Sequence, residues 1–556
     1  MTRPILPSAF PSLGRRSLFG LGAAGLLGPG AQAQTSSQTP PRPPTAPKGQ
    51  VIIGVSQEPT KFNPLMPAIE VDQGVWWNVF SPLWNVQPDG GFTPVLAREV
   101  PGLENGGISA DGLSWRIRLR EGVKWHDGAP FTAEDVKFTL QLINNPDFRA
   151  GSRNGHDLVR DIQVVSPTEI SWRMERAFAT YPSILAWTFM VPKHILEKAG
   201  DPNNAAFNNA PIGTGPFRWG ERVAGDHILL LANRDHVGEG PYLERLVFKY
   251  IPDLTVMYTQ FRTGEIDHTS IQGITADHYE EARDLRDRVV LINPSASVES
   301  ITPNLAHPAL GDRAVREALY AAINKKAIVD TIYYGLPALT ESFLPQQSWA
   351  YAADLPKQQF DPGRANRILD EAGWKRGADG VRAKDGVRLE FTNSTTAGNQ
   401  LREQAQQLLI QDWKAVGAAM KINNMPAAVV WGDYFRLSKF DSVMVGVTFG
   451  VGSDPDASDR LASTSIPARG GSGRNTIQYA NPAVDALLRE GVTSFDRAKR
   501  RTIYAQVQKQ VRDDLAILPL FQYATIEGVK KGLVGYQPNI NTLSSCWNCA
   551  TWFWAS

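Results

Sequence analysis

Eight histidines, two cysteines and a few closely spaced carboxylates are the residues of this chain that suit catalysis or metal binding. The histidines are scattered, without metal-ligand spacing, at positions 126, 156, 194, 227, 236, 268, 278 and 307. The motifs GxSxG, GxxxxGK[ST] and HExxH are absent. Asp454 and Asp456 lie within one loop, which gives little reason to expect a catalytic pair. We therefore predict that the protein is not an enzyme and that it binds no metal ion and no cofactor. An exported hydrolase with an unrecognised site stays the alternative.

Composition places the chain among globular proteins with more than one subdomain. It has 556 residues, of which 42% are hydrophobic and 20% charged. The formal net charge is +1, but residues 1–33 hold three arginines and no acid. Without them the chain carries 54 basic and 56 acidic side chains, a net charge of −2. There is no basic surplus for holding nucleic acid, so we predict no nucleic-acid partner.

The N-terminus has the pattern of an export signal. Arg15 and Arg16 form a twin-arginine pair, followed by a short Gly/Ala/Leu segment and the small-x-small site Ala31-Gln32-Ala33. The apolar run is too short to span a bilayer. We expect cleavage near Ala33 and a periplasmic protein. The residue directly after the site is Gln34 and not a cysteine, so we expect no lipid anchor on the mature N-terminus. The general export route stays open beside the twin-arginine route.

The two cysteines, Cys546 and Cys549, lie in the segment SCWNCATWFW near the C-terminus. Four interpretations compete: a local disulfide, a redox pair, half of a metal site, and two free thiols. No other Cys or His lies nearby in sequence to complete a zinc site. Because the expected compartment is oxidising, we favour a Cys546–Cys549 disulfide.

A strand, a turn and a helix are predicted between residues 115 and 143. Trp115, Ile117 and Leu119 alternate with arginines, which indicates a strand with one buried face. His126 belongs to a turn that is expected to hold the strand–helix junction. Thr132 precedes Asp135 by three residues, which indicates a capping box at the start of a helix. Further helices are predicted over 315–323, 361–373, 401–416 and 498–511, and strands over 51–55, 162–165, 169–174 and 516–521.

Six motifs in this chain, taken in order, resemble a known family. They are the EP-x-x-x-NP loop at 58–64, LREGVKWHDGAPFTAEDVKFTL at 119–140, GTGPF at 213–217, GEID at 264–267, the helix ending in EAGW at 371–374, and the apolar strand at 516–521. Together they closely resemble the peptide-type (dipeptide, oligopeptide and nickel, family 5) extracytoplasmic solute-binding proteins of ABC importers. The glycines of GTGPF are expected where backbones approach closely.

The resemblance implies an α/β, two-lobed periplasmic-binding-protein fold of the large class, with an extra subdomain and a cleft that closes by a hinge. We expect an export signal at 1–33, a Pro-rich spacer at 34–49 and lobe I at 50–298, with a satellite subdomain at about 98–211. Lobe II is expected at 299–524, and residues 525–556 return to lobe I. The implied function is capture of a small polar solute, a peptide or a peptide-like molecule, for import.

Ligand contacts are expected from aromatic side chains and from loops that resemble the family's cleft. The candidates are Thr60, Phe62, Trp76, Trp77, Asn304, Trp349, Trp431, Thr448, Phe449 and Val451. For each aromatic residue, a role in core packing is about equally expected.

The loop Val447–Asp456 bears most on ligand class, because it resembles the family's W-x-x-D-x-x-D/E-P segment. In peptide-binding members the first Asp of that pattern holds the α-ammonium group of the ligand. Here the position is Val451, whereas Asp454-Pro455 is retained and is expected to fix the loop. A buried ammonium group without a partner is costly. The loop therefore argues against α-amino peptides in the usual register and leaves modified peptides, opine-like conjugates, oligosaccharides and other polar metabolites.

The resemblance also implies partners. We expect a monomer that hands a solute or peptide ligand to the membrane subunits of an ABC permease. A ligand-sensing subunit that reports to a membrane receptor is a further alternative.

Overall fold

Residues 41–67, 69–270 and 273–555 are described by the computed structural model of the chain. The export signal expected over 1–33 and part of the spacer expected over 34–49 lie outside the described residues. No helix in the described part of the chain is long and apolar enough to cross a membrane.

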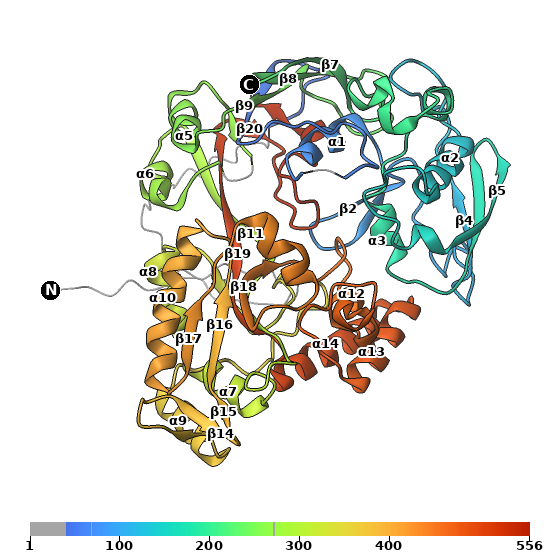
Figure 1. Cartoon of the computed structure of the whole chain (residues 1–556). Coiled ribbons are helices and arrows are strands. Elements are labelled where there is room, and N and C mark those ends of the chain that lie inside the picture. Colours follow the sequence, from blue (N-terminus) through green and yellow to red (C-terminus); the bar gives the residue numbers. More distant parts are fainter. Residues whose placement is uncertain (1–40, 68, 271–272, 556) are drawn as a thin grey trace, which may run out of the picture. The chain divides into compact units, whose positions relative to one another are not determined.

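One mixed sheet of eleven strands organises the fold (Figure 1). Its order is β17 (Ala419–Ile422), β16 (Glu390–Ser394), β18 (Ser442–Val447), β11 (Arg288–Pro303), β19 (Leu518–Lys530), β10 (His268–Thr269), β1 (Gln50–Val55), β9 (Arg245–Tyr250), β8 (His227–Ala232) and β7 (Phe217–Val223), with β12 (Ala338–Leu339) paired to β19. Parallel pairs, β16–β17 and β16–β18 on one side and β1–β9 and β1–β10 on the other, flank the antiparallel pair β11–β19.

The long strands β11 and β19 connect the two halves of this sheet. The two strands are paired as far as Pro294 and again from Val298 onward, and the register shifts between these two residues. On one side of the shift β19 pairs with β10, and on the other side β11 pairs with β18. The intervening residues 295–297 form a bulge, which bends a strand and turns its side chains. The strand pair thus crosses from one half to the other, and the bulge marks the crossing.

The helices and the smaller sheets cover this framework. The helices are α1 (Asp72–Val79), α2 (Ala133–Asn144), α3 (Tyr181–Leu185), α4 (Lys193–Leu196), α5 (Leu254–Thr263), α6 (Tyr279–Arg283), α7 (Arg313–Ala321), α8 (Lys325–Ile332), α9 (Pro362–Glu371), α10 (Gln400–Ala415), α11 (Ala427–Val429), α12 (Ser458–Leu461), α13 (Pro482–Thr493) and α14 (Arg497–Asp514). The smaller sheets are β4 (Ser114–Arg118), β6 (Glu169–Met174) and β5 (Val159–Ser166); β13 (Lys375–Arg376), β14 (Arg382–Lys384) and β15 (Val387–Arg388); β2 (Trp84–Val86) and β3 (Phe92–Pro94); and β20 (Leu533–Val534) and β21 (Phe553–Trp554).

The predicted strand, turn and helix are confirmed as β4 and α2. Trp115 and Ile117 are each 1% exposed, and the alternating Arg116 and Arg118 are exposed to solvent. The predicted capping box is present, because the Thr132 hydroxyl accepts a hydrogen bond from the Glu134 amide and the Asp135 carboxylate accepts one from the Thr132 amide. The caps at both ends of the predicted helix 361–373 are confirmed in the same way, by the Asp361 carboxylate and by the left-handed Gly373.

His126 joins this turn to the GTGPF segment. Its ring nitrogens lie 3.0 Å from the Gly215 carbonyl oxygen and 3.2 Å from the Gly213 amide nitrogen. Burial lowers the pKa of His126 to about 4, so the ring is neutral at pH 7. A Cβ atom on Gly213 would lie 1.8 Å from the Val79 carbonyl oxygen at the end of α1. The predicted close approach of backbones is therefore present, and it fixes α1 against the satellite sheet.

Residues 546–552 complete the apolar core to which strand β1 belongs. Cys546, Cys549 and Trp552 pack in one apolar cluster with Val51 and Ile53 of β1. Separate clusters lie beneath the satellite sheet β4–β6–β5 and between the helices of residues 301–523.

Candidate functional site

A cavity of about 570 Å³, here called the main chamber, lies where the two halves of the sheet meet. Residues 64–67, α1, residues 183–188 and residues 540–543 line one side, and Ala296 and residues 448–452 line the other. Trp76 and Trp187 supply flat apolar surface, and Ser183, Thr188 and Asn541 supply hydrogen-bonding groups. A volume of this size, with mixed apolar and polar walls, is typical of small-molecule binding sites.

The lining of the main chamber is uncharged at neutral pH. His156 is the one titratable side chain among its described lining residues. Its ring nitrogens lie 3.1 Å from the Tyr181 hydroxyl and 3.2 Å from the Thr188 hydroxyl, and burial lowers its pKa to about 4. The buried Oε1 atom of Gln73 has no hydrogen-bond partner among the described residues. An unsatisfied acceptor in such a cavity favours a ligand that donates a hydrogen bond.

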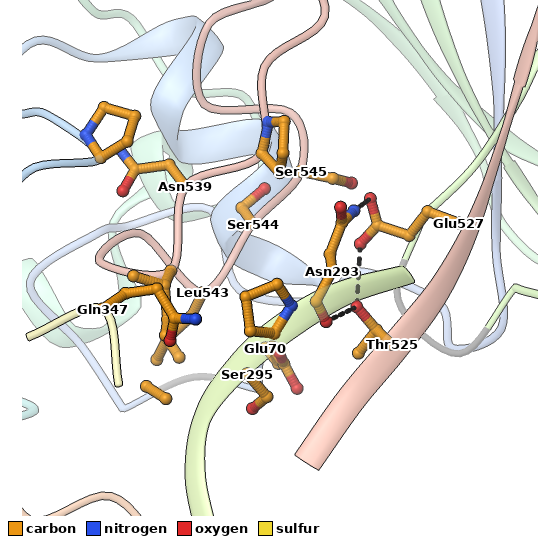
Figure 2. A pocket seen from close by; sticks show the side chains of 15 residues that line it. Glu70, Asn293, Ser295, Gln347, Thr525, Glu527, Asn539, Leu543, Ser544 and Ser545 are labelled. Carbon is orange, nitrogen blue, oxygen red and sulfur yellow. Dashed lines mark hydrogen bonds between the residues drawn. The ribbon is translucent and has the colours of Figure 1, made fainter. Parts of the chain in front are cut away.

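A smaller cavity of about 170 Å³, here called the hinge chamber, adjoins the main chamber. The two share Ala296, Ile540 and Leu543 as lining residues. Its walls come from the β11 bulge, the facing part of β19 and the C-terminal segment 538–545 (Figure 2). In contrast to the main chamber it contains two carboxylates, Glu70 and Glu527.

The loop between β18 and α12 is fixed by a buried ion pair. Asp454 is 4% exposed, and its carboxylate accepts two hydrogen bonds of 2.7 Å from the Arg500 guanidinium group on α14. It also accepts a hydrogen bond of 3.2 Å from the Thr180 hydroxyl, which belongs to the satellite region. Val451 and Asp454 exchange backbone hydrogen bonds of 2.8 and 2.9 Å. The ion pair therefore holds the chain segment that lines the main chamber, in the fixing role predicted for Asp454.

Asp456 lies next to this pair without a cation of its own. Burial, and then the charge of Asp454, raise the pKa of Asp456 to about 6. A folded-state pKa above the unfolded value means that this residue stabilises the fold below about pH 4, and that its contribution is lost as the pH rises through 6. We expect Asp456→Asn to raise the free energy of unfolding at pH 7.5 by about 1–3 kcal/mol.

Chemical denaturation at pH 4 and pH 7.5 tests this expectation. The gain in stability should shrink at pH 4, where the wild-type carboxyl is mostly protonated. The substitution is structurally mild. The Ser458 amide donates to one Asp456 oxygen at 2.9 Å, and the side-chain carbonyl oxygen of an asparagine can accept the same hydrogen bond. A variant that is equally destabilised at both pH values would contradict the expectation.

Four of the ten predicted ligand contacts lie in or beside the main chamber. Trp76, Thr448 and Val451 line it directly. Trp349 lines two neighbouring cavities, with Thr448 in one of them, and its indole nitrogen donates to the Ser453 carbonyl at 2.9 Å. These four stay our proposed ligand-contacting residues.

The other six make contacts elsewhere. Phe62 is fully buried against Trp219, Phe449 packs on Phe343, and Asn304 donates to the carbonyls of Ser438 and Phe440. Trp77 lines a separate cavity, the Trp431 indole donates to the Thr396 hydroxyl, and the amide of the exposed Thr60 donates to Asp72. The adjacent Trp76 and Trp77 point to different cavities because neighbouring helical residues face different sides.

Several lining residues were missed by sequence reasoning. Trp187 and His156 lie in short irregular segments without a recognisable motif. Glu527 carried a usable signal, because an acid within the apolar strand segment YATIEGV is unusual and implies a partner or a function. Asn541 and Leu543 reach the cleft through a C-terminal segment that contains no helix or strand.

The expected disulfide is not formed in this structure, and an oxidised Cys546–Cys549 pair stays a prediction. Cys546 and Cys549 are both free thiols and fully buried. The Cys549 thiol donates a hydrogen bond of 3.2 Å to the Cys546 carbonyl oxygen instead of bonding to the other sulfur. The neighbouring Cys549 thiol, and after it His268, lower the pKa of the Cys546 thiol to about 5, and burial raises the pKa of Cys549. Each thiol thus has polar neighbours of its own.

Comparison with known proteins identifies relatives over most of the chain. Residues 91–467 match the family described as bacterial extracellular solute-binding proteins, family 5 Middle. The oligopeptide-binding protein AppA of Bacillus subtilis is 26% identical over 503 residues, which cover 88% of this chain and 89% of that protein. Protein XP55 of Streptomyces lividans is 30% identical over 467 residues, covering 84% and 82%.

The fold agrees with solved structures of the same kind. NikZ from Campylobacter jejuni, solved in complex with Ni(L-His), is 27% identical, with a TM-score of 0.74 over 91% of this chain and 99% of that chain. The expected α/β two-lobed fold is confirmed by this similarity. With a family match over more than half of its length, the chain belongs to the family 5 bacterial extracellular solute-binding proteins.

Proposed function

We propose that this protein captures a small polar solute in the main chamber and presents it to the membrane subunits of an ABC importer. The observation that carries the proposal is the uncharged main chamber of about 570 Å³, which is lined from both halves of a sheet connected by β11 and β19. Burial between two lobes excludes water from the ligand, which strengthens each hydrogen bond in the closed state.

The details of this proposal follow the expected organisation. Lobe I comprises residues 50–298 with a satellite subdomain at about 98–211, lobe II comprises 299–524, and residues 525–556 return to lobe I. The mature protein is a periplasmic monomer without a lipid anchor, released by cleavage near Ala33. It binds and closes without catalysing a reaction.

Relatives bind chemically different ligands, which sets the range of candidates. AppA of Bacillus subtilis was solved with a nonapeptide, and NikZ with Ni(L-His). For this chain we propose a peptide-like or other polar metabolite, and not a peptide held by its α-ammonium group at the loop 447–456. The support is Val451, which lines the main chamber and offers no charge there.

Native mass spectrometry of the protein purified from its own periplasm tests the function. We expect a discrete excess mass of a few hundred daltons, released on denaturation, and a more compact particle in X-ray scattering once the solute is bound. A bare protein that consumes candidate solutes would favour the exported hydrolase. Binding without an effect of gene deletion on growth on that solute would favour a sensor.

Val451→Asp is expected to create or strengthen affinity for free-amine peptides. The new carboxylate would enter the main chamber, where a ligand ammonium group gains a charge-assisted hydrogen bond. Calorimetry with a panel of peptides and their N-acetylated forms measures the effect, and Val451→Asn controls for polarity without charge. Unchanged affinity across the panel would refute the assignment of Val451 to the ammonium position.

A further inference from the structure

Glu527 is a buried carboxylate that faces the hinge chamber without a cationic partner. Glu527 is 6% exposed. No Lys, Arg or His of the described chain lies within ion-pair distance of its carboxylate. Its Oε2 atom accepts hydrogen bonds from the Asn293 amide at 3.0 Å and from the Tyr536 hydroxyl. The one partner of Oε1 among the described residues is the Thr525 hydroxyl at 3.5 Å (Figure 2). Oε1 thus keeps most of its capacity to accept.

Other buried acids in the described chain are compensated in two ways. Asp72 and Asp135 accept hydrogen bonds from backbone amides, whereas Glu299 and Asp454 are bound by arginine. Glu299 on β11 is fully buried and is bound by the Arg402 guanidinium group at 2.8 and 2.9 Å. Asp454 is bound by Arg500 in the same way. The Oε1 atom of Glu527 has neither a backbone-amide donor nor an ion-pair partner among the described residues. Because a poorly compensated buried charge is costly, such an oxygen facing a cavity favours a ligand that brings a positive charge.

No basic side chain faces Glu527 inside the hinge chamber in the described chain, but His268 acts on its charge from behind. The described residues that line the hinge chamber include Glu70 and Glu527 and no basic side chain. His268 lies behind Glu527, outside ion-pair distance and outside the lining of the hinge chamber. Its ring nitrogens lie 3.0 Å from the Gly528 carbonyl oxygen and from the Ser545 hydroxyl, and its charge lowers the pKa of Glu527 against the larger effect of burial. Burial raises the pKa of Glu527, and burial together with the charge of Glu527 raises the pKa of Glu70. The pKa of each carboxyl is raised on balance, so the chain does not fully compensate the charge of either carboxylate.

The hinge chamber also has the right position for one end of a ligand. It shares Ala296, Ile540 and Leu543 with the uncharged main chamber, so a single elongated molecule can occupy both. Its volume of about 170 Å³ suits an ammonium or guanidinium group with a short aliphatic stem. The neutral body of such a molecule would lie against Trp76 and Trp187.

We propose that the solute carried by this protein has a cationic group, an amine or a guanidine, which binds in the hinge chamber between Glu527 and Glu70. This inference rests on the proposed function and names its substrate class. Because Glu527 lies on β19 and Asn293 on β11, the cation would bind to the two strands that connect the lobes. Binding of the positive charge of the ligand would then act directly on the strands that set the relative position of the two lobes.

A capture experiment with a defined mixture tests the proposal. Wild-type protein is incubated with linear polyamines, guanidino compounds and end-blocked Lys or Arg peptides, each beside its N-acetylated or citrulline counterpart, and with neutral oligosaccharides. After washing and denaturation, mass spectrometry identifies the bound solutes. A periplasmic extract is tested in parallel. We expect cationic solutes to be captured and their neutral counterparts to be lost.

Glu527→Gln is the decisive variant, because it removes the charge and keeps the shape and the oxygen that Asn293 contacts. We expect about a 30-fold or greater loss of affinity for a captured cationic solute. Glu70→Gln, at the exposed rim, is expected to cost less. Glu265→Gln, on an exposed turn outside the lining of both chambers, is the matched control with unchanged affinity.

The outcomes separate this inference from the proposed function. If wild type captures only neutral or anionic solutes, from the mixture or from the extract, the cationic class is overturned and the binding function stands. The same holds if a captured cation binds Glu527→Gln as tightly as wild type while calorimetric unfolding shows both proteins folded. If nothing is captured from either source, both the inference and the proposed function fail.

Discussion

Arg500→Met is expected to destabilise the protein by about 3–5 kcal/mol, because it leaves the buried Asp454 carboxylate without its cation. Both guanidinium hydrogen bonds to Asp454, each 2.7 Å long, would be lost. Asp454 holds Val451 through two backbone hydrogen bonds, so the wall of the main chamber would loosen as well. Denaturant unfolding measures the first effect, and the solute retained in native mass spectra measures the second.

Two further variants sharpen this prediction. Arg501→Met, on the same helix but exposed, should change stability by about 0.5 kcal/mol or less. The double variant Asp454→Leu with Arg500→Met should recover part of the loss, because replacing both charges of a buried pair is far milder than removing one. If the double variant is less stable than Arg500→Met alone, the loss comes from packing and not from the uncompensated charge.

Gly213→Ala is expected to destabilise the protein by about 3 kcal/mol or more, since overpacking against backbone cannot be relieved by rotating a side chain. The added Cβ atom would lie 1.8 Å from the Val79 carbonyl oxygen and 3.1 Å from the Phe80 ring. Moving residue 213 would also disturb its amide hydrogen bond to His126. Thermal and denaturant unfolding measure the cost.

Gly363→Ala is the control for this substitution. Gly363 is exposed in helix α9, and a Cβ built on it would meet only two side-chain atoms, of Asp361 at 3.2 Å and of Arg367 at 3.6 Å. Its effect on stability should be within about 0.5 kcal/mol. Equal effects at the two positions would show that the contact between GTGPF and α1 tolerates a shift.

Local rules were enough to predict the framework of the fold. The Thr132 capping box, the buried alternation at Trp115 and Ile117, and the caps of α9 each follow from short-range patterns, and each is present. The full extent of β19 was not predicted. The apolar run ends at Phe521, but the strand continues to Lys530 because it pairs with β11 and β10. Such pairing is a tertiary effect that a local pattern does not encode.

The candidate site was harder to predict for a related reason. A stretch such as Trp76-Trp77 reveals a helix and two large side chains, but the cavity each side chain faces depends on distant segments. Phe62 and Phe449 became core residues because Trp219 and Phe343 pack on them. The hinge chamber depends on a register shift between Pro294 and Val298, for which the sequence has no separate signal.

The return of the C-terminus into the first core constrains how the chain is made. On the ribosome, β1 emerges long before the residues that complete its surroundings, which include Cys546, Trp547 and Trp552. The Asn78 side chain bonds to the Cys546 carbonyl 468 positions later, and the Trp77 indole bonds to the Thr542 carbonyl. Contacts of such long range form late and slowly. We therefore expect this core of the nascent chain to stay incompletely folded until residues 542–552 have left the ribosome.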